Sequence, residues 1–327
     1  MNPKVSIIMP TFNRAGIIAK AILSVQRQTF KDWELIVMDD GSRDDTRDVI
    51  EGLIKEDPRI RYFYKENEGL SPTRAKGISH ARGEYICLID DDDFYLPHKF
   101  EVQADYLDQN PKKGLVYSYV DQVTGDGTFV RKLPVKPADT FNELVNECTI
   151  QVVSVMVRKE CFDRLGTFRS DMKGIDDYEM WLRISRAYEI GFLPDTVGLY
   201  VRHQGNMSGN TQLRYDGLMD LYQVVLSWDL SADERKKVAH SCALRTYWHA
   251  CLLRGMNKYD EAASCFARSV RFYPLIGRSI TWSRFGNIAY QVIKPYLAVV
   301  FCRLKAVMMA AKKQPRNPKK HPLPHKN

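Results

Sequence analysis

The chain has 327 residues and a formal net charge of +8, with 44% hydrophobic and 27% charged residues. This length allows one large domain or two ordinary ones, and the composition excludes a wholly disordered, collagen-like or small disulfide-stapled protein. The eight Lys and Arg residues after position 302 account for the whole excess charge. The neutral remainder is unlike a nucleic-acid-binding protein, and the basic tail favours contact with an anionic surface.

The first 125 residues alternate between predicted strands and helices. Apolar runs predict strands at 5–9, 35–38, 61–64, 85–89 and 115–120. Helical spacing and capping residues predict helices at 15–28, 42–53, 71–81 and 97–109. Ser42 with Asp45 resembles a capping box, and Ser71 followed by Pro72 is typical of an N-cap with proline in the first turn. The alternation predicts a parallel sheet with helices on both faces.

The pattern is less regular after residue 125. We expect strands near 128–132, 151–157 and 197–202, and helices at 177–187, 231–254, 258–273 and 286–311. The last 14 residues are expected to be disordered. The sequence therefore predicts an α/β region over 1–210 with halves at 1–125 and 126–210, a helical region over 211–311, and a basic tail over 312–327.

The cysteines and the two ends of the chain indicate a cellular compartment. The seven cysteines are an odd number without a C-x-x-C pair, which favours reduced thiols over a disulfide framework or a zinc site. The N-terminus has no signal-peptide pattern, and the apolar run at 295–302 is far shorter than the ~20 residues of a spanning helix. We therefore expect a cytosolic protein.

Polar residues follow three of the predicted buried strands. Residues 10–14 follow the first strand, Asp39 and Asp40 the second, and residues 90–93, all aspartate, the fourth. In an open parallel sheet, ligands bind beyond the carboxyl ends of the strands. The sequence has neither a G-x-G-x-x-G fingerprint nor a P-loop, so acidic side chains rather than glycines occupy the expected site.

Four consecutive aspartates at the end of a buried strand are unfavourable unless their charge is neutralised. A divalent cation held by one or two carboxylates, with water and phosphate as further ligands, fits this arrangement. The alternative is an acidic turn in which Asp93 caps the helix that opens near Pro97. Asp39 and Asp40 are likewise compatible with ordinary turn chemistry.

Several segments of the first 210 residues form an ordered set of motifs. They are Val5–Arg14, Ser24–Phe30, Trp33–Ser42, Asn67–Ser71 with Arg74, Gly83–Ile86, Asp90–Asp92, Asp176–Arg183 and Tyr200–Ser208. This set resembles glycosyltransferase family 2. The resemblance implies a GT-A fold, which is α/β and Rossmann-like with a mostly parallel sheet, and here the helical region after 210 would extend it. It also implies transfer of a sugar from a nucleotide-sugar donor.

The resemblance implies roles for the residues that would bind the donor. The main chain at Pro10 and Thr11, the ring of Phe12 and the carboxylate of Asp40 would hold the base and ribose, with Asp40 accepting from a uracil N3–H. The family often has Tyr where this chain has Phe12. Arg14 would also belong to the donor site, and Arg74 would lie near the diphosphate, unless it is a solvated helix residue.

The resemblance also implies a metal site and a catalytic base. Asp92 would bind Mn²⁺ or Mg²⁺, and Asp90 or Asp91 would bind the ribose or a metal-bound water. His203 would approach the metal or the diphosphate, unless it caps a strand end. Asp177 would remove the proton from the acceptor hydroxyl in one inverting displacement, unless it is only a helix N-cap.

These expectations define a metal-dependent hexosyl- or N-acetylhexosaminyltransferase that uses a UDP sugar. Its acceptor would be a glycan or lipid-linked glycan in cell-surface polysaccharide synthesis, and nucleic acid is not an expected partner. The apolar and basic residues of 286–327 suit attachment to the cytosolic face of an anionic membrane, or else packing on the protein or on a second copy. The rival classes are a catalytically silent nucleotide-sugar binder and a membrane-surface scaffold.

Overall fold

The computed structural model describes residues 2–138, 140–172, 174–203, 211–274 and 295–306. The chain forms two compact units, Met1–Val225 and Leu226–Asn327. The boundary between them falls at the end of helix α8 (Thr211–Leu226), whereas the sequence predicts a boundary at residue 210. The predicted division at residue 125 stays a prediction, and the tail over 312–327 lies outside the described residues.

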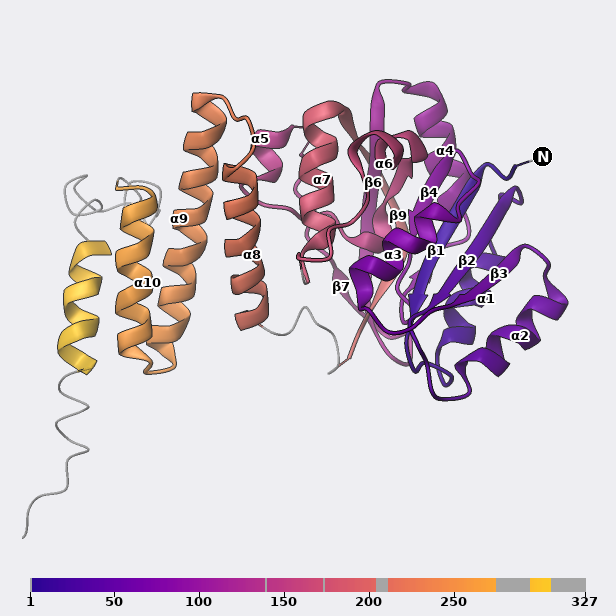
Figure 1. Cartoon of the computed structure of the whole chain (residues 1–327), viewed down its shortest axis with the longest axis horizontal. Helices are drawn as coiled ribbons and strands as arrows, with labels where there is room; N and C mark the ends of the chain where they lie inside the picture. Colours follow the sequence, from indigo (N-terminus) through magenta and orange to yellow (C-terminus); the bar gives the residue numbers. More distant parts are fainter. Residues whose placement is uncertain (1, 139, 173, 204–210, 275–294, 307–327) are drawn as a thin grey trace, which may run out of the picture. The chain divides into compact units, whose positions relative to one another are not determined.

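A mixed nine-stranded sheet forms the centre of the first unit (Figure 1). Its strands are β1 (Val5–Thr11), β2 (Trp33–Asp39), β3 (Ile60–Tyr64), β4 (Tyr85–Leu88), β5 (Phe94–Tyr95), β6 (Lys113–Thr124), β7 (Phe129–Lys132), β8 (Met156–Arg158) and β9 (Glu189–Arg202). They lie in the order β3-β2-β1-β4-β8-β6-β9-β5, and β7 pairs with β6.

The direction of the strands determines which loops meet. Strands β1 to β4 pair in parallel, and β6 pairs in parallel with β9. Strand β8 lies between β4 and β6 and is antiparallel to both, so the two parallel groups run in the same direction. The carboxyl ends of β1 to β4, β6 and β9 therefore lie at one edge of the sheet, which we call the carboxyl edge.

Helices cover both faces of this sheet. The first unit contains α1 (Ile18–Gln26), α2 (Thr46–Glu56), α3 (Leu70–Ser79), α4 (Lys99–Gln109), α5 (Phe141–Leu144), the 3-10 helix η1 (Val152–Ser154), α6 (Lys159–Leu165), α7 (Asp176–Ala187) and α8. Helices α1, α2 and α4 share a buried core with Ile7 and Met9 of β1. Helix α3 packs on the opposite face, where Gly77 meets Ile8. Because both faces are covered, every residue of β1 and β2 is buried.

The predicted strands and helices of the first 125 residues are confirmed, but the predicted helix starts are wrong. Helix α2 begins at Thr46 without a side-chain cap, because the Ser42 hydroxyl instead accepts a bond from the Asn13 N–H. Helix α3 begins at Leu70 after Gly69, whose φ of +92° is open to glycine. The apolar run at 151–157 is split between η1 and β8 rather than forming one strand.

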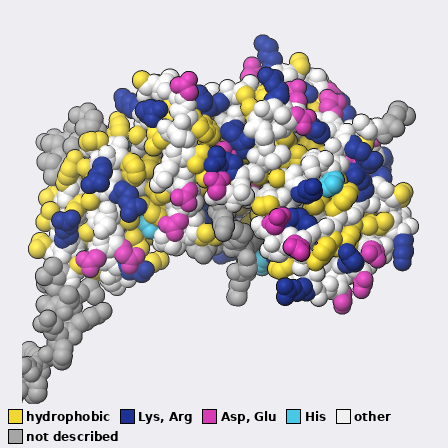
Figure 2. All heavy atoms as spheres, viewed as in Figure 1, with side chains coloured by type: hydrophobic (Ala, Val, Ile, Leu, Met, Phe, Trp, Pro, Cys, Tyr) yellow, Lys and Arg dark blue, Asp and Glu magenta, His cyan; other side chains and the backbone are white. Residues whose placement is uncertain are grey.

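The second unit contains a helical hairpin of α9 (Ala232–Gly255) and α10 (Tyr259–Phe272), which confirms the two predicted helices (Figure 1). Ser231 and Glu234 form a capping box at the start of α9. Cys302, within a helix over 295–306, completes the hairpin's core. The rest of the predicted helix over 286–311 lies outside the described residues. Figure 2 shows hydrophobic and basic side chains interspersed over this unit.

All seven cysteines are free thiols, as predicted. The buried ones are Cys87, Cys161, Cys242, Cys265 and Cys302. Burial raises the pKa of Cys87 to about 11 and the pKa of Cys161 and of Cys242 to about 12. Across the described residues we find no helix with the length and apolar content needed to cross a membrane.

Candidate active site

Two loops at the carboxyl edge are tied together by reciprocal hydrogen bonds. The Asn13 N–H donates to the Ser42 hydroxyl at 2.8 Å, and the Arg43 N–H donates to the Asn13 side-chain oxygen at 2.8 Å. Asn13 has a φ of 54°, a left-handed conformation that Asn tolerates. The bonds fix the turn after Phe12, whose ring is 44% exposed and available for stacking. Pro10 and Thr11, also predicted to bind the donor, are buried at the end of β1.

Asp40 organises the loop that follows β3. Its carboxylate accepts the N–H groups of Glu68 at 3.0 Å and Gly69 at 2.8 Å, and it forms an ion pair with Lys65. Both oxygens of Asp40 are therefore engaged within the protein. A uracil N3–H would have to join or displace one of these donors, and the base-binding role of Asp40 stays a prediction.

Asp91 and Asp93 point into the protein from the end of β4. Asp91 accepts a bond from the Thr11 hydroxyl at 2.7 Å and lies 3.3 Å from Arg14 Nε, and burial raises its pKa to about 6. Asp93 accepts the Val201 N–H at 3.0 Å, and burial raises its pKa well above the usual range. Asp93 thus bonds to β9, and no side chain caps helix α4, so the predicted capping role of Asp93 is wrong, although the aspartate run does form a turn.

Asp90 and Asp92 carry the accessible carboxylates of the same run. Their side chains are 36% and 16% exposed. Asp92 Oδ2 lies 2.7 Å from Nε2 of His203, so the structure brings the two predicted metal ligands together. No group of three or more His, Cys, Asp or Glu side chains is placed to hold a metal within the described part of the chain. An ion here would take two protein ligands, a carboxylate and an imidazole, and further ligands from water or phosphate.

Arg74 joins the aspartate run to the start of α7. Its guanidinium donates to Asp90 at 2.7 Å and to Asp176 at 3.2 Å, and its carbon lies 5.8 Å from the centre of the Phe168 ring. Only 3% of Arg74 is exposed, so the alternative of a solvated helix residue is wrong. The buried cation offsets the charge of two acidic motifs that lie far apart in the sequence.

Asp177 lies in the first turn of α7, next to Asp176. The helix begins at Asp176 after Ile175, so Asp177 is not the N-cap residue. Burial and the charge of Asp176 raise the pKa of Asp177 to about 6, against the opposing effect of Arg74. A half-buried carboxylate with a pKa near neutrality suits general-base chemistry.

Comparison with known proteins identifies the family. The model for "Glycosyl transferase family 2" matches residues 6–166. The Escherichia coli protein WfgD, a "UDP-Glc:alpha-D-GlcNAc-diphosphoundecaprenol beta-1,3-glucosyltransferase", is 30% identical over 212 residues, which cover 63% of this chain and 80% of WfgD. The chain belongs to glycosyltransferase family 2. An uncharacterized glycosyltransferase of Rickettsia typhi is 32% identical to this family 2 member over 203 residues, covering 58% and 61% of the two chains. Matches to further Rickettsia glycosyltransferases span as little as 31% of those proteins.

Solved structures establish the fold of this family 2 member. S. aureus TarS 1–349 in complex with UDP-GlcNAc aligns with a TM-score of 0.67 and 15% identity, covering 95% of this chain and 92% of TarS. The mannosyltransferase PcManGT of Pyrobaculum calidifontis, in complex with GDP-Man and Mn²⁺, aligns with a TM-score of 0.59 and 18% identity, covering 95% and 86%. The GT-A-like fold with a helical C-terminal region, expected from the sequence, is confirmed.

Two features of the candidate site were not predicted from the sequence. Lys65 pairs with Asp40 from the end of β3, and Asp176 shares Arg74 with Asp90. The Lys65–Asp40 pair could have been predicted, because Lys65 directly follows a strand that ends at the carboxyl edge. The second depends on a contact between residues 102 positions apart and leaves no local signal.

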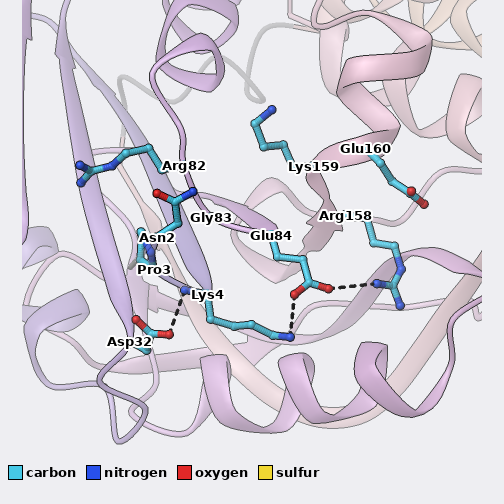
Figure 3. A pocket seen from close by; sticks show the side chains of 10 residues that line it. All are labelled: Asn2, Pro3, Lys4, Asp32, Arg82, Gly83, Glu84, Arg158, Lys159 and Glu160. Atoms are coloured by element: carbon cyan, nitrogen blue, oxygen red, sulfur yellow. Dashed lines mark hydrogen bonds and ion pairs between the residues drawn. The ribbon is translucent and has the colours of Figure 1, made fainter.

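A cavity of about 450 Å³ lies away from this site (Figure 3). It is lined by Asn2, Pro3, Lys4, Asp32, Arg82, Gly83, Glu84, Arg158, Lys159 and Glu160. These residues surround the amino ends of β1 and β4, opposite the carboxyl edge. Glu84 pairs with Lys4 at 2.7 Å and lies 3.6 Å from Arg158. One carboxylate thus lies between two cations in this part of the lining.

Proposed function

We propose that the protein transfers a hexosyl or N-acetylhexosaminyl group from a UDP sugar to a hydroxyl of a lipid-linked glycan, in cell-surface polysaccharide synthesis on the cytosolic side of the membrane. The observation that carries this proposal is the Arg74 bridge, which brings Asp90 and Asp176 together and sets Asp177 beside the aspartate run. The named activity of WfgD supports both a UDP-sugar donor and a diphosphoundecaprenol-linked acceptor. The TarS complex with UDP-GlcNAc also supports a UDP sugar.

The donor would bind along the carboxyl edge. The exposed ring of Phe12 offers a stacking face for the base, and the Asp40-anchored loop forms the adjoining wall. Arg14, which is partly exposed beside Asp91, can reach the ribose or phosphate region. Because the reciprocal bonds between Asn13 and the Ser42–Arg43 turn already order these loops, donor binding would require little further ordering.

The transfer requires one base and one displacement. The acceptor oxygen forms a bond to the anomeric carbon as the bond to UDP breaks on the opposite face, and Asp177 takes the hydroxyl proton. The anomeric centre is inverted, and no covalent sugar–enzyme bond forms. Asp177 is suited to this role because its carboxylate is ionised above about pH 6 while retaining a higher proton affinity than a solvated aspartate.

Asp92 and His203 would hold a divalent ion. An accessible carboxylate and an imidazole nitrogen 2.7 Å apart are a donor set that Mn²⁺ accepts, and Mn²⁺ accompanies GDP-Man in the PcManGT complex. When bound, Mn²⁺ or Mg²⁺ would act as a Lewis acid on the diphosphate of the leaving nucleotide. Arg74 and Asp90 would keep the neighbouring carboxylates in place.

The donor class is tested by a thermal-shift titration with UDP, GDP, CDP and dTDP, each with and without Mn²⁺ or Mg²⁺. Ligand at about 100 times its dissociation constant adds ~2.7 kcal/mol of stability, which raises the melting temperature measurably. We expect a metal-dependent shift with UDP that Asp92→Ala loses. A shift with GDP alone, or none with any nucleotide, would contradict the proposed donor.

Catalysis is tested with Asp177→Asn. Removing the base while keeping the shape of the side chain should lower kcat by about 10²- to 10⁴-fold and leave the UDP-dependent thermal shift intact. The matched control is Asp171→Asn, because Asp171 is an exposed aspartate paired only with Arg169 among the bonds observed for it. Equal activity of Asp177→Asn and the wild type would favour a different base, and no turnover by the wild type with any UDP sugar would favour a silent binder.

A further inference from the structure

The helix over 295–306 has two apolar sides. One side packs on the α9–α10 hairpin through Cys302, Ala298 and Val299. The other side carries five large apolar side chains that are 44–61% exposed: Tyr296, Leu297, Val300, Phe301 and Leu304. Their positions repeat at intervals of three to four residues, which places them on one face of the helix. We call this surface the apolar face.

Every charged residue of this helix, and of the sequence from residue 262 onward, is basic. From residue 262 to the end, the sequence contains thirteen Lys and Arg residues and no Asp or Glu. On the helix itself Arg303 is exposed, and Lys305 Nζ lies 5.8 Å from the centre of the Phe301 ring. Figure 2 shows basic and hydrophobic side chains over the second unit, with acidic ones at its lower end. Long basic side chains beside apolar ones can keep their charged ends in a headgroup layer.

This combination distinguishes between the candidate occupants. A second copy of the chain would bring a segment of the same positive charge against the face, which is unfavourable. A nucleic acid would satisfy the charge but would leave five apolar side chains against a polar partner. An anionic bilayer surface satisfies both, because its headgroups attract Lys and Arg and its acyl boundary accepts apolar side chains.

We propose that the apolar face docks the protein on an anionic lipid bilayer. Tyr296, Leu297, Val300, Phe301 and Leu304 enter the acyl boundary, and Arg303 and Lys305 lie at the level of the headgroups. Because the opposite side of this helix packs on the α9–α10 hairpin through Cys302, the helix would lie along the bilayer surface. Docking does not depend on the proposed transferase activity, but it would hold the enzyme at the membrane that contains a lipid-linked acceptor.

The test is flotation of the 327-residue protein with vesicles, without nucleotide, metal or acceptor. We expect binding to vesicles of phosphatidylglycerol and phosphatidylcholine in equal parts. Binding to vesicles of phosphatidylcholine alone should be at least about tenfold weaker. High salt should also weaken binding to the anionic vesicles, because it screens the attraction between headgroups and basic side chains. Failure to float with anionic vesicles would overturn the proposal and leave the transferase proposal untouched.

Matched single substitutions locate the contact. Phe301→Glu and Leu23→Glu each place one carboxylate at an exposed apolar position, 48% and 40% exposed, the first on the apolar face and the second on α1. Phe301→Glu should weaken binding to anionic vesicles by about tenfold or more, and Leu23→Glu by less than about twofold. An unchanged melting temperature confirms that both variants are folded.

Four results would overturn the assignment of this face. Phe301→Glu could bind vesicles as the wild type does, or Leu23→Glu could lose binding equally. Alternatively, sedimentation could show a dimer that Phe301→Glu dissociates in a protein that does not float, which would assign the face to a second copy. Binding of single-stranded RNA by a protein that does not float would assign the basic segment to nucleic acid.

Discussion

The protonation of Asp177 depends on a cation that is not its direct partner. Arg74 bonds to Asp90 and Asp176, yet its charge lowers the pKa of Asp177 from the higher value that burial and Asp176 would produce. Arg74 is therefore a positioning residue with an electrostatic effect. It keeps the proposed base ionised near neutral pH while it holds two acidic motifs together.

This arrangement predicts the pH dependence of transfer. A base must be ionised to act, and the pKa of Asp177 is raised to about 6, so kcat/KM should fall as the pH drops through about 6. Arg74→Met removes the opposing cation, which should move this acidic limb to higher pH. Arg74→Lys keeps the charge and should leave the limb near its original pH, even if kcat falls because the fork-shaped contacts are lost.

The measurement is a pH profile of kcat/KM for the three proteins, with folding checked by thermal melting at each pH. Removing Arg74 takes the shared cation from the buried carboxylate of Asp176 and from the partly exposed carboxylate of Asp90, so Arg74→Met should also be less stable. A limb that stays at the same pH in Arg74→Met would show that Arg74 does not control the base.

At the scale of secondary-structure elements, burial explains which predictions succeed. Strands β1 and β2 are covered on both faces, so they appear in the sequence as continuous apolar runs. The run at 151–157 is equally apolar, but Val152–Ser154 turns into a 3-10 helix before the short strand β8. Apolar runs of this length do not distinguish strand from helical turn, and tertiary contacts decide between them.

The predicted helix starts were wrong because tertiary contacts also decide the caps. The Ser42 hydroxyl could cap α2 locally, but it accepts a bond from Asn13, a residue of the neighbouring loop. The positions of the site loops were predictable, because the ends of parallel strands share an edge. The Arg74 bridge was not predictable, because it depends on the contact between α3 and the start of α7, which are far apart in the sequence.

Helix α3 offers a test of how closely elements must approach. A Cβ at Gly77 would lie 2.4 Å from Cγ2 of Ile8 and 3.0 Å from Cγ of Met38. Gly77→Ala should therefore push α3 away from β1 and β2 and lower the unfolding free energy by about 1–3 kcal/mol. It should also displace Arg74, which lies one helical turn before Gly77. Chemical denaturation measures the first effect, and turnover measures the second.

Gly52 provides the matched control within α2. An added Cβ there meets nothing within 4 Å. Gly52→Ala should be neutral or stabilise the protein by about 0.5–1 kcal/mol, because alanine favours a helix interior over glycine. Equal stability of the two variants would contradict the close packing of α3 on the sheet.

At the scale of the whole molecule, the two units divide the proposed tasks. The candidate active site is contained in the first unit, and the apolar face belongs to the second. Each unit has a buried core of its own. The family resemblance in the sequence predicted the first unit, because its motifs lie at strand ends, whereas the helical unit offered only its amphipathic pattern and charge.

This division predicts the behaviour of a fragment. Residues 1–230, which end between α8 and α9, should fold and retain the UDP-dependent thermal shift while losing flotation with anionic vesicles. Circular dichroism, thermal shift and flotation measure the three properties. A fragment that is unfolded, or that still floats, would show that the units do not divide in this way.

The buried thiols allow the opening of each unit to be timed separately. Cys87 and Cys161 lie in the first unit, and Cys242, Cys265 and Cys302 lie in the second. A thiolate must form and meet solvent before it reacts with a disulfide reagent, so buried thiols with raised pKa values are labelled only during local or global unfolding. Mass spectrometry of the labelled peptides would then give two opening rates from one sample. We expect UDP to slow labelling at Cys87 and Cys161 and to leave the other three unchanged.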